Sequence, residues 1–205
     1  MEEVASQPEC WPKAIEMAAL VGPALPASGE RVAVIGCGSS LNVARCYARL
    51  REAGGHGETD AFPASEVPST RRYDRMVFVS RTGTTTEVLD ALRRVPSGVT
   101  TTAVAADPDS PLPREAGTAV VLDFADERSV VSSRFITSSI MLLRAHLGAD
   151  LRALPGEAAR ELARPLPPGL AEHAEFTFLG RGWAAAVADE AALKLREASR
   201  TWAES

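Results

Sequence analysis

Three stretches rich in hydroxyl side chains could bind an anion. They are Ser39-Ser40, the run from Ser80 to Thr86 (SRTGTTT), and Ser132-Ser133. Each follows an apolar run of the kind that forms a buried strand, and helical periodicity resumes shortly afterwards. Hydroxyl groups donate hydrogen bonds, and the first amides of a helix lie unpaired at the positive end of its dipole. Together the three stretches predict a phosphate site.

A glycine turn, Gly36-Cys37-Gly38, precedes the first stretch, and we include Gly38 in the predicted anion site. Such a turn between a strand and a helix also occurs in dinucleotide sites. Here the third glycine of that motif is replaced by Leu41, although Asp60 lies at a suitable distance to bind a ribose. A dinucleotide would not require hydroxyls in the Ser80–Thr86 loop, so the pattern favours a single phosphate.

A second group of residues carries charges at helical spacing near the end of the chain. Glu190, Lys194 and Glu197 share one helix face, because side chains three and four residues apart lie side by side. On spacing alone, we read these three residues as a solvated stripe that holds an ion pair between side chains four residues apart.

The elements that must position these residues alternate between strand and helix. The predicted strands are Arg31–Ile35, Thr59–Phe62, Met76–Val79, Thr101–Ala105 and Ala119–Leu122. The predicted helices are Trp11–Leu20, one opening at Ser39, Glu87–Val95 and about Phe135–Leu147. This alternation predicts an α/β fold, a doubly wound five-stranded parallel sheet between helices. The hydroxyl loops would then meet at the carboxyl edge of the sheet, where ligands bind.

The last part of the sequence resembles the beginning of the first unit. A strand signal at Glu175–Leu179 and the turn Gly180-Arg181-Gly182 lead into a long helix, Trp183–Trp202. We expect the start of a second, truncated copy, and we divide the chain into a helix and connector (1–30), a first domain with the predicted phosphate site (31–154), a linker (155–174) and a partial second unit (175–205). An apolar stripe on the long helix would need cover, which predicts a homodimer. The stripe consists of Ala191, Leu195, Ala198 and Trp202.

Composition excludes several classes of function. The 205 residues are 45% hydrophobic and 24% charged, with a net charge of −5, which argues against a nucleic-acid partner that relies on a basic face. No apolar run reaches the roughly 18 residues of a membrane span, and the acidic start MEEVASQPEC does not look like a secretory signal. The three cysteines are scattered, so we expect no metal and no cofactor, and a cytoplasmic protein.

Five motifs in order resemble the sugar isomerase (SIS) domain family, and their spacing is most similar to the isomerase half of the glucosamine-6-phosphate synthases. They are GCGSS (36–40), ASEV (64–67), SRTGTT (80–85), ERSVVSSR (127–134) and DEAALKLREAS (189–199). The resemblance implies a five-stranded parallel sheet, duplicated along the chain and usually dimeric. It also implies a sugar 6-phosphate as the ligand.

The resemblance assigns roles by position. The residues implied in phosphate binding are Ser39, Ser40, Ser80, Thr82 and Thr85, while Val130 and Ser132 match positions that contact the sugar. Three positions depart from the pattern. Arg81 stands where the synthases have a glutamine, Thr84 replaces a glutamate, and Arg134 replaces a lysine. These departures concern the identity of the sugar more than its phosphate.

The resemblance also implies a reaction. Glu197 matches the glutamate that moves a proton between the first two carbons of the opened sugar, and Lys194 would stabilise charge on the substrate oxygens. The ring-opening histidine of the family would lie beyond residue 205. We therefore expect aldose–ketose isomerisation of a hexose or amino-sugar 6-phosphate, with amination or deamination as a variant. A non-catalytic phosphosugar sensor is the alternative, and a dinucleotide-binding enzyme is the third reading.

Overall fold

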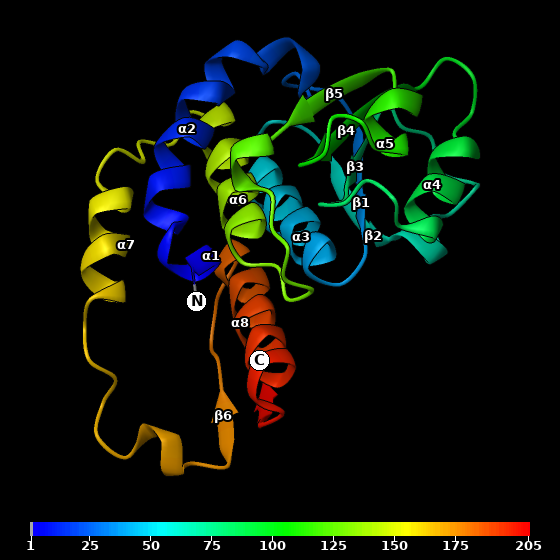
Figure 1. Ribbon diagram of the computed structural model, residues 1–205. Helices are drawn as coiled ribbons and strands as arrows, with labels where there is room; N and C mark the ends of the chain where they lie inside the picture. Colours follow the sequence, from blue (N-terminus) through cyan, green and yellow to red (C-terminus); the bar gives the residue numbers. More distant parts are fainter. Residues whose placement is uncertain (1) are drawn as a thin grey trace.

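A parallel sheet of five strands forms the centre of the structure, a computed structural model that describes residues 2–205 (Figure 1). The strands are β1 (Val32–Gly36), β2 (Thr59–Pro63), β3 (Arg75–Val79), β4 (Thr100–Ala105) and β5 (Thr118–Val121). Their order is β2-β1-β3-β4-β5, and every neighbouring pair is parallel. The predicted five-stranded parallel sheet is confirmed.

Alternate residues of each strand pack against helices on opposite faces of the sheet. Val77 and Val79 of β3 face one core, while Met76 and Phe78 face the other. The first core lies beneath α2 (Gln7–Leu20), α3 (Ser39–Ala53) and α6 (Arg134–His146), and the second beneath α4 (Thr86–Arg93) and α5 (Pro111–Glu115). Both faces of the sheet are thus covered, as the near-continuous apolar strands predicted.

The remaining short elements lie in the connections. They are α1 (Glu2–Ala5), η1 (Gly22–Ala24), η2 (Ala64–Glu66), η3 (Asp123–Ala125), α7 (Leu154–Leu162) and η4 (Leu170–Glu172). The sequence analysis expects no helix at α5, two of whose five residues are prolines. Pro111 stands in the first turn of the helix, where its missing N–H costs no hydrogen bond because first-turn amides have no partner within the helix.

The last three elements form a small unit of their own. Strand β6 (Glu175–Thr177), helix α8 (Trp183–Ser199) and strand β7 (Trp202–Glu204) form a βαβ unit whose two strands are parallel. A Cβ atom on Gly36 would lie 2.6 Å from the backbone carbon of Ser40, and one on Gly180 would lie 2.4 Å from that of Ala184. Both glycine turns therefore bring the helix against the strand in the same way.

The predicted helix Trp183–Trp202 was too long. Helix α8 ends at Ser199 because Arg200 adopts the left-handed conformation, with a φ of 59°. Trp202 consequently lies in β7, and placing it on an apolar stripe of the helix was wrong.

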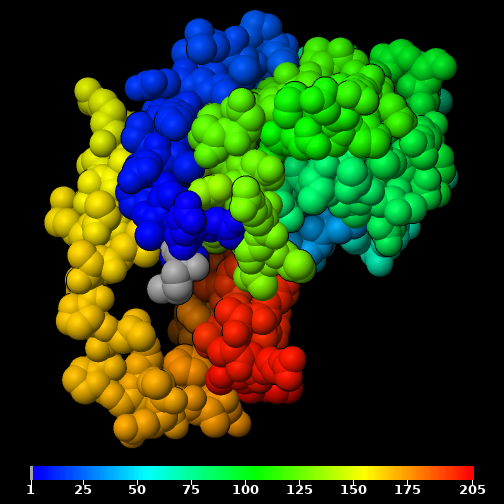
Figure 2. Space-filling view, viewed as in Figure 1, coloured from blue at the N-terminus to red at the C-terminus, as the bar shows by residue number. Residues whose placement is uncertain are grey.

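Two further features concern the outside of the molecule. Residues 163–174, which follow α7, run along an arm that stands away from the body and are almost all exposed (Figure 2). No helix within residues 2–205 combines the length and apolarity that crossing a membrane requires.

Candidate functional site

The chain reverses its direction of winding between β1 and β3. From β1 it runs through α3 to β2 on one side, and it then returns across β1 to β3 and continues outward. At such a reversal the two following loops diverge and leave a crevice outside the carboxyl ends of the strands. The loops at this crevice are residues 37–40, after β1, and residues 80–85, after β3.

A cavity of about 200 Å³ lies at this point, and ten of the eleven predicted site residues line it. These ten are Ser39, Ser40, Ser80, Arg81, Thr82, Thr85, Val130, Ser132, Lys194 and Glu197. Gly38, the eleventh, lies in the turn just before α3. Cys37 and Ile136 complete the lining, so four separate segments of the chain converge on one cavity.

The loop after β3 holds its hydroxyl groups in a fixed arrangement. Ser80 is buried, and its Oγ lies 3.0 Å from Oγ1 of Thr85. Gly83 has a φ of 62°, and a Cβ atom there would lie 2.0 Å from Oγ of Ser110. The loop is therefore packed against the following connection, and its hydroxyls are positioned before any ligand arrives.

The third hydroxyl stretch is arranged differently from the other two. Glu127 is buried, and its carboxylate accepts hydrogen bonds from the amides of Ser133 (2.7 Å), Arg134 (3.2 Å) and Phe135 (3.1 Å). The hydroxyl of Ser133 also donates to it, at 2.7 Å. An internal anion thus occupies the N-terminus of α6. This leaves the N-termini of α3 and α4 facing the cavity.

Arg81 connects the loop after β3 to the segment before α6. Its guanidinium donates to the backbone carbonyl of Glu127 and lies 3.5 Å from the carboxylate of Asp126. Only 17% of the side chain is exposed. Arg81 lines the cavity, but part of its hydrogen-bonding capacity is already used within the protein.

Three charged side chains of α8 form a continuous set at the other side of the cavity. Nζ of Lys194 lies 2.6 Å from Oε2 of Glu197 and 3.5 Å from Oε1 of Glu190. Glu190 is only 8% exposed, and its Oε2 accepts a hydrogen bond of 2.9 Å from Asn42 of α3. Burial raises the pKa of Glu190, against the lowering effects of Asn42 and Lys194.

The reading of these three residues as a solvated stripe is therefore wrong for Glu190. Helix α8 packs against α3, and this contact buries the carboxylate beside Asn42. Sequence reasoning did not place Glu190 in the site, because helical spacing alone cannot show which face of α8 meets another helix.

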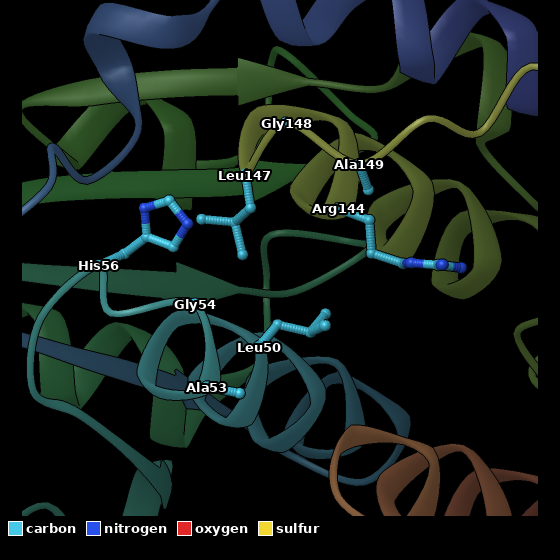
Figure 3. A pocket seen from close by; sticks show the side chains of 8 residues that line it. All are labelled: Leu50, Ala53, Gly54, His56, Arg144, Leu147, Gly148 and Ala149. Atoms are coloured by element: carbon cyan, nitrogen blue, oxygen red, sulfur yellow. The ribbon is translucent and has the colours of Figure 1, made fainter.

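A larger cavity of about 330 Å³ lies at the opposite end of α3 (Figure 3). Leu50 and Leu147 point into the space between the ends of α3 and α6, with His56 beside them (Figure 3). Its lining is mainly apolar, with His56 and Arg144 as the polar side chains, and it includes none of the predicted site residues. The smaller cavity, which gathers those residues, is therefore the functional candidate.

Asp60, the candidate ribose ligand of the dinucleotide reading, is engaged within the protein. Its Oδ2 accepts a hydrogen bond of 2.6 Å from the hydroxyl of Tyr73 and lies 2.9 Å from the guanidinium of Arg71. A ribose would have to displace these partners, which counts against a dinucleotide.

No family model matches the chain, but comparison with known proteins finds several that are similar to it. The isomerizing glutamine–fructose-6-phosphate aminotransferase of Pectobacterium atrosepticum is 29% identical over 96% of this chain and 36% of the relative. The glucosamine-6-phosphate deaminase of Thermotoga maritima superposes with a TM-score of 0.76 at 25% identity, over 99% of this chain and 68% of that one. The Escherichia coli tagatose-6-phosphate ketose/aldose isomerase shares the fold, with a TM-score of 0.78 at 17% identity over 99% and 65%. The chain thus spans about a third of the length of the aminotransferase.

Proposed function

We infer that the chain is a member of the sugar isomerase (SIS) fold family, and we propose that it binds a hexose 6-phosphate or an amino-sugar 6-phosphate and isomerises it between aldose and ketose. One observation carries the proposal. The hydroxyl loops after β1 and β3 and the Lys194–Glu197 pair of α8 line the same cavity at the switch point of the sheet.

The loops provide the features that a phosphate requires. Two helix N-termini, those of α3 and α4, open toward the cavity, and hydroxyl groups of Ser39, Ser40, Ser80 and Thr85 line it. Unpaired helix amides and hydroxyl donors bind a phosphate without a metal ion. Because α6 has its own carboxylate at its N-terminus, the proposed site holds one phosphate.

The α8 residues provide what proton transfer requires. In the proposed reaction, Glu197 takes a proton from one of the first two carbons of the opened sugar and returns it to the other. Lys194 lies between Glu197 and the buried Glu190, so its ammonium group is held at the cavity, where it would stabilise negative charge on the substrate oxygens. Amination or deamination at the second carbon is a variant of the same proposal.

Thermal unfolding in the presence of ligands tests the binding step. Glucose 6-phosphate, fructose 6-phosphate or their amino derivatives should raise the melting temperature, because a ligand that binds only the folded state stabilises it by mass action. The unphosphorylated sugars should have much less effect. Stabilisation by NAD, together with no response to any sugar phosphate, would contradict the proposal.

A further inference from the structure

The segment from Asp126 to Ser133 is held in place from outside the cavity by the N-terminal residues of the chain. Oε1 of Glu3 accepts hydrogen bonds from the backbone amides of Arg128 (2.6 Å) and Ser129 (3.3 Å). Glu3 lies in the short helix α1 and does not line the cavity. The contact joins residues 125 positions apart in the sequence.

A second contact extends the same attachment. The hydroxyl of Ser6 lies 3.0 Å from a guanidinium nitrogen of Arg134, and that guanidinium also donates to the carbonyl oxygen of Asp126, at 2.8 Å from Nε. The carboxylate of Asp126 in turn faces Arg81 in the cavity. A chain of polar contacts therefore runs from the N-terminal helices to the wall of the cavity.

The middle of the segment has little other support. Glu127 fixes the end that leads into α6, but Val130 is 94% exposed. Next to it, the amide of Val131 has one hydrogen-bond partner among residues 2–205, the nearby Ser129 hydroxyl, at 3.2 Å. Burial acts to raise the pKa of Glu3, but the hydrogen bonds from the backbone amides of Arg128 and Ser129 hold that pKa below its ordinary value. Glu3 is therefore ionised at neutral pH and acts as a charged acceptor.

We infer that Glu3 is a positioning residue, whose carboxylate fixes the backbone before Val130 and Ser132 so that these two residues can contact the sugar. The inference rests on the proposed function. It assigns the N-terminal helix to the recognition of the sugar and not to that of the phosphate, which is bound by the loops after β1 and β3.

The test compares two ligands on variants of the full chain. Glu3→Ala removes the acceptor, Glu3→Gln retains a neutral acceptor, and Glu2→Ala changes an exposed neighbour on the same helix as a control. Calorimetric titration with fructose 6-phosphate should show about tenfold weaker binding for Glu3→Ala, a smaller loss for Glu3→Gln and no change for Glu2→Ala. Competition by inorganic phosphate should remain unchanged in all three variants.

Hydrogen exchange provides a readout that needs no ligand. The amides of Arg128 and Ser129 should exchange faster in Glu3→Ala, while those of the central strands should keep their protection. Faster exchange with unchanged binding of fructose 6-phosphate would overturn the positioning role. An equal loss for fructose 6-phosphate and inorganic phosphate would also overturn it. If the parent protein binds inorganic phosphate but no sugar phosphate, the proposed function itself fails, and the inference falls with it.

Discussion

Substitutions can distinguish the proposed catalytic role of Glu197 from the proposed phosphate-binding role of the loops, because they should affect turnover and binding differently. Glu197→Gln keeps the size of the side chain and removes the base, so binding of the sugar phosphate should survive. Turnover should fall by a factor of about 10² or more. Exchange of the C1 or C2 hydrogen of fructose 6-phosphate with solvent deuterium, followed by NMR, measures the step directly.

The matched comparison is the double variant Ser80→Ala with Thr82→Ala, which should weaken binding because each change removes a donor to the phosphate. If exchange occurs in the parent and is unchanged in Glu197→Gln, the assignment of the base is refuted. Tight binding without exchange in the parent would favour a phosphosugar sensor.

Glu190 predicts an unusual dependence of stability on pH. Burial raises its pKa in the folded state above the ordinary value of 4.5, so the folded protein binds more protons than the unfolded chain just above that pH. The free energy of unfolding contributed by this group is then fully present below about pH 4.5 and is lost as the pH rises through the raised pKa. Glu190→Gln cannot ionise and should lack this loss.

Urea unfolding of the parent and Glu190→Gln between about pH 4.5 and about pH 7 measures the difference. The free energy of unfolding of Glu190→Gln should rise relative to that of the parent as the pH rises. Parallel curves for the two proteins would show that the buried carboxylate is not destabilised in the folded state.

Sequence analysis found the residues whose role follows from their chemical type and their position after a strand. It missed those whose role depends on burial by distant parts of the chain. Ser39, Ser80 and Thr85 were predicted because hydroxyls at strand ends have a meaning that holds in any parallel sheet. Glu127 and Glu190 were not, because each depends on burial that the local sequence does not show. Asn42, the hydrogen-bond partner of Glu190, lies 148 residues away on α3. No local pattern in the sequence indicates that α3 contacts α8.

At the scale of elements, the two glycine turns leave no room for a side chain between strand and helix. Gly36→Ala should destabilise the protein by about 1–3 kcal/mol, because the added methyl group meets the backbone of Ser40 and must displace the start of α3. Gly22→Ala is the control, since a Cβ atom there meets nothing within 4 Å. Chemical denaturation measures both, and equal effects would show that the turn tolerates a side chain.

Element prediction succeeded for the strands of the central sheet and failed at the end of α8. The strands of the central sheet alternate between two cores, and their apolar runs were recognised with small errors at the ends. Strand β7 was read as helix, because Trp202 continues the apolar spacing of α8. Its three residues are strand only because β6 lies beside them, a pairing that the local sequence does not reveal.

At the scale of the molecule, we propose that β6, α8 and β7 begin a second copy of the first unit and that this unit supports a homodimer. The β6–β7 sheet has two strands, and Leu179 and Trp202 near it are 88% and 67% exposed. Unpaired sheet edges and exposed apolar side chains favour association.

Sedimentation at high micromolar concentration should therefore show a dimer, and Trp202→Lys should shift it toward monomer. Leu20→Lys changes an equally prominent apolar residue, 81% exposed, on α2 and should leave the dimer intact. A parent protein that sediments as a monomer would refute the proposal.

The exposed arm at residues 163–174 has a consequence for how the cavity is held together. The phosphate loops precede the arm and the Lys194–Glu197 pair follows it, so the cavity exists only where α8 docks on α3. A protease that cuts the arm would leave two fragments held together only by non-covalent contacts, among them those of α8 with α3 and of Trp183 with Arg144 of α6. A sugar phosphate that contacts both fragments would stabilise their complex. On a size-exclusion column, the cleaved protein should then stay together longer when the ligand is bound.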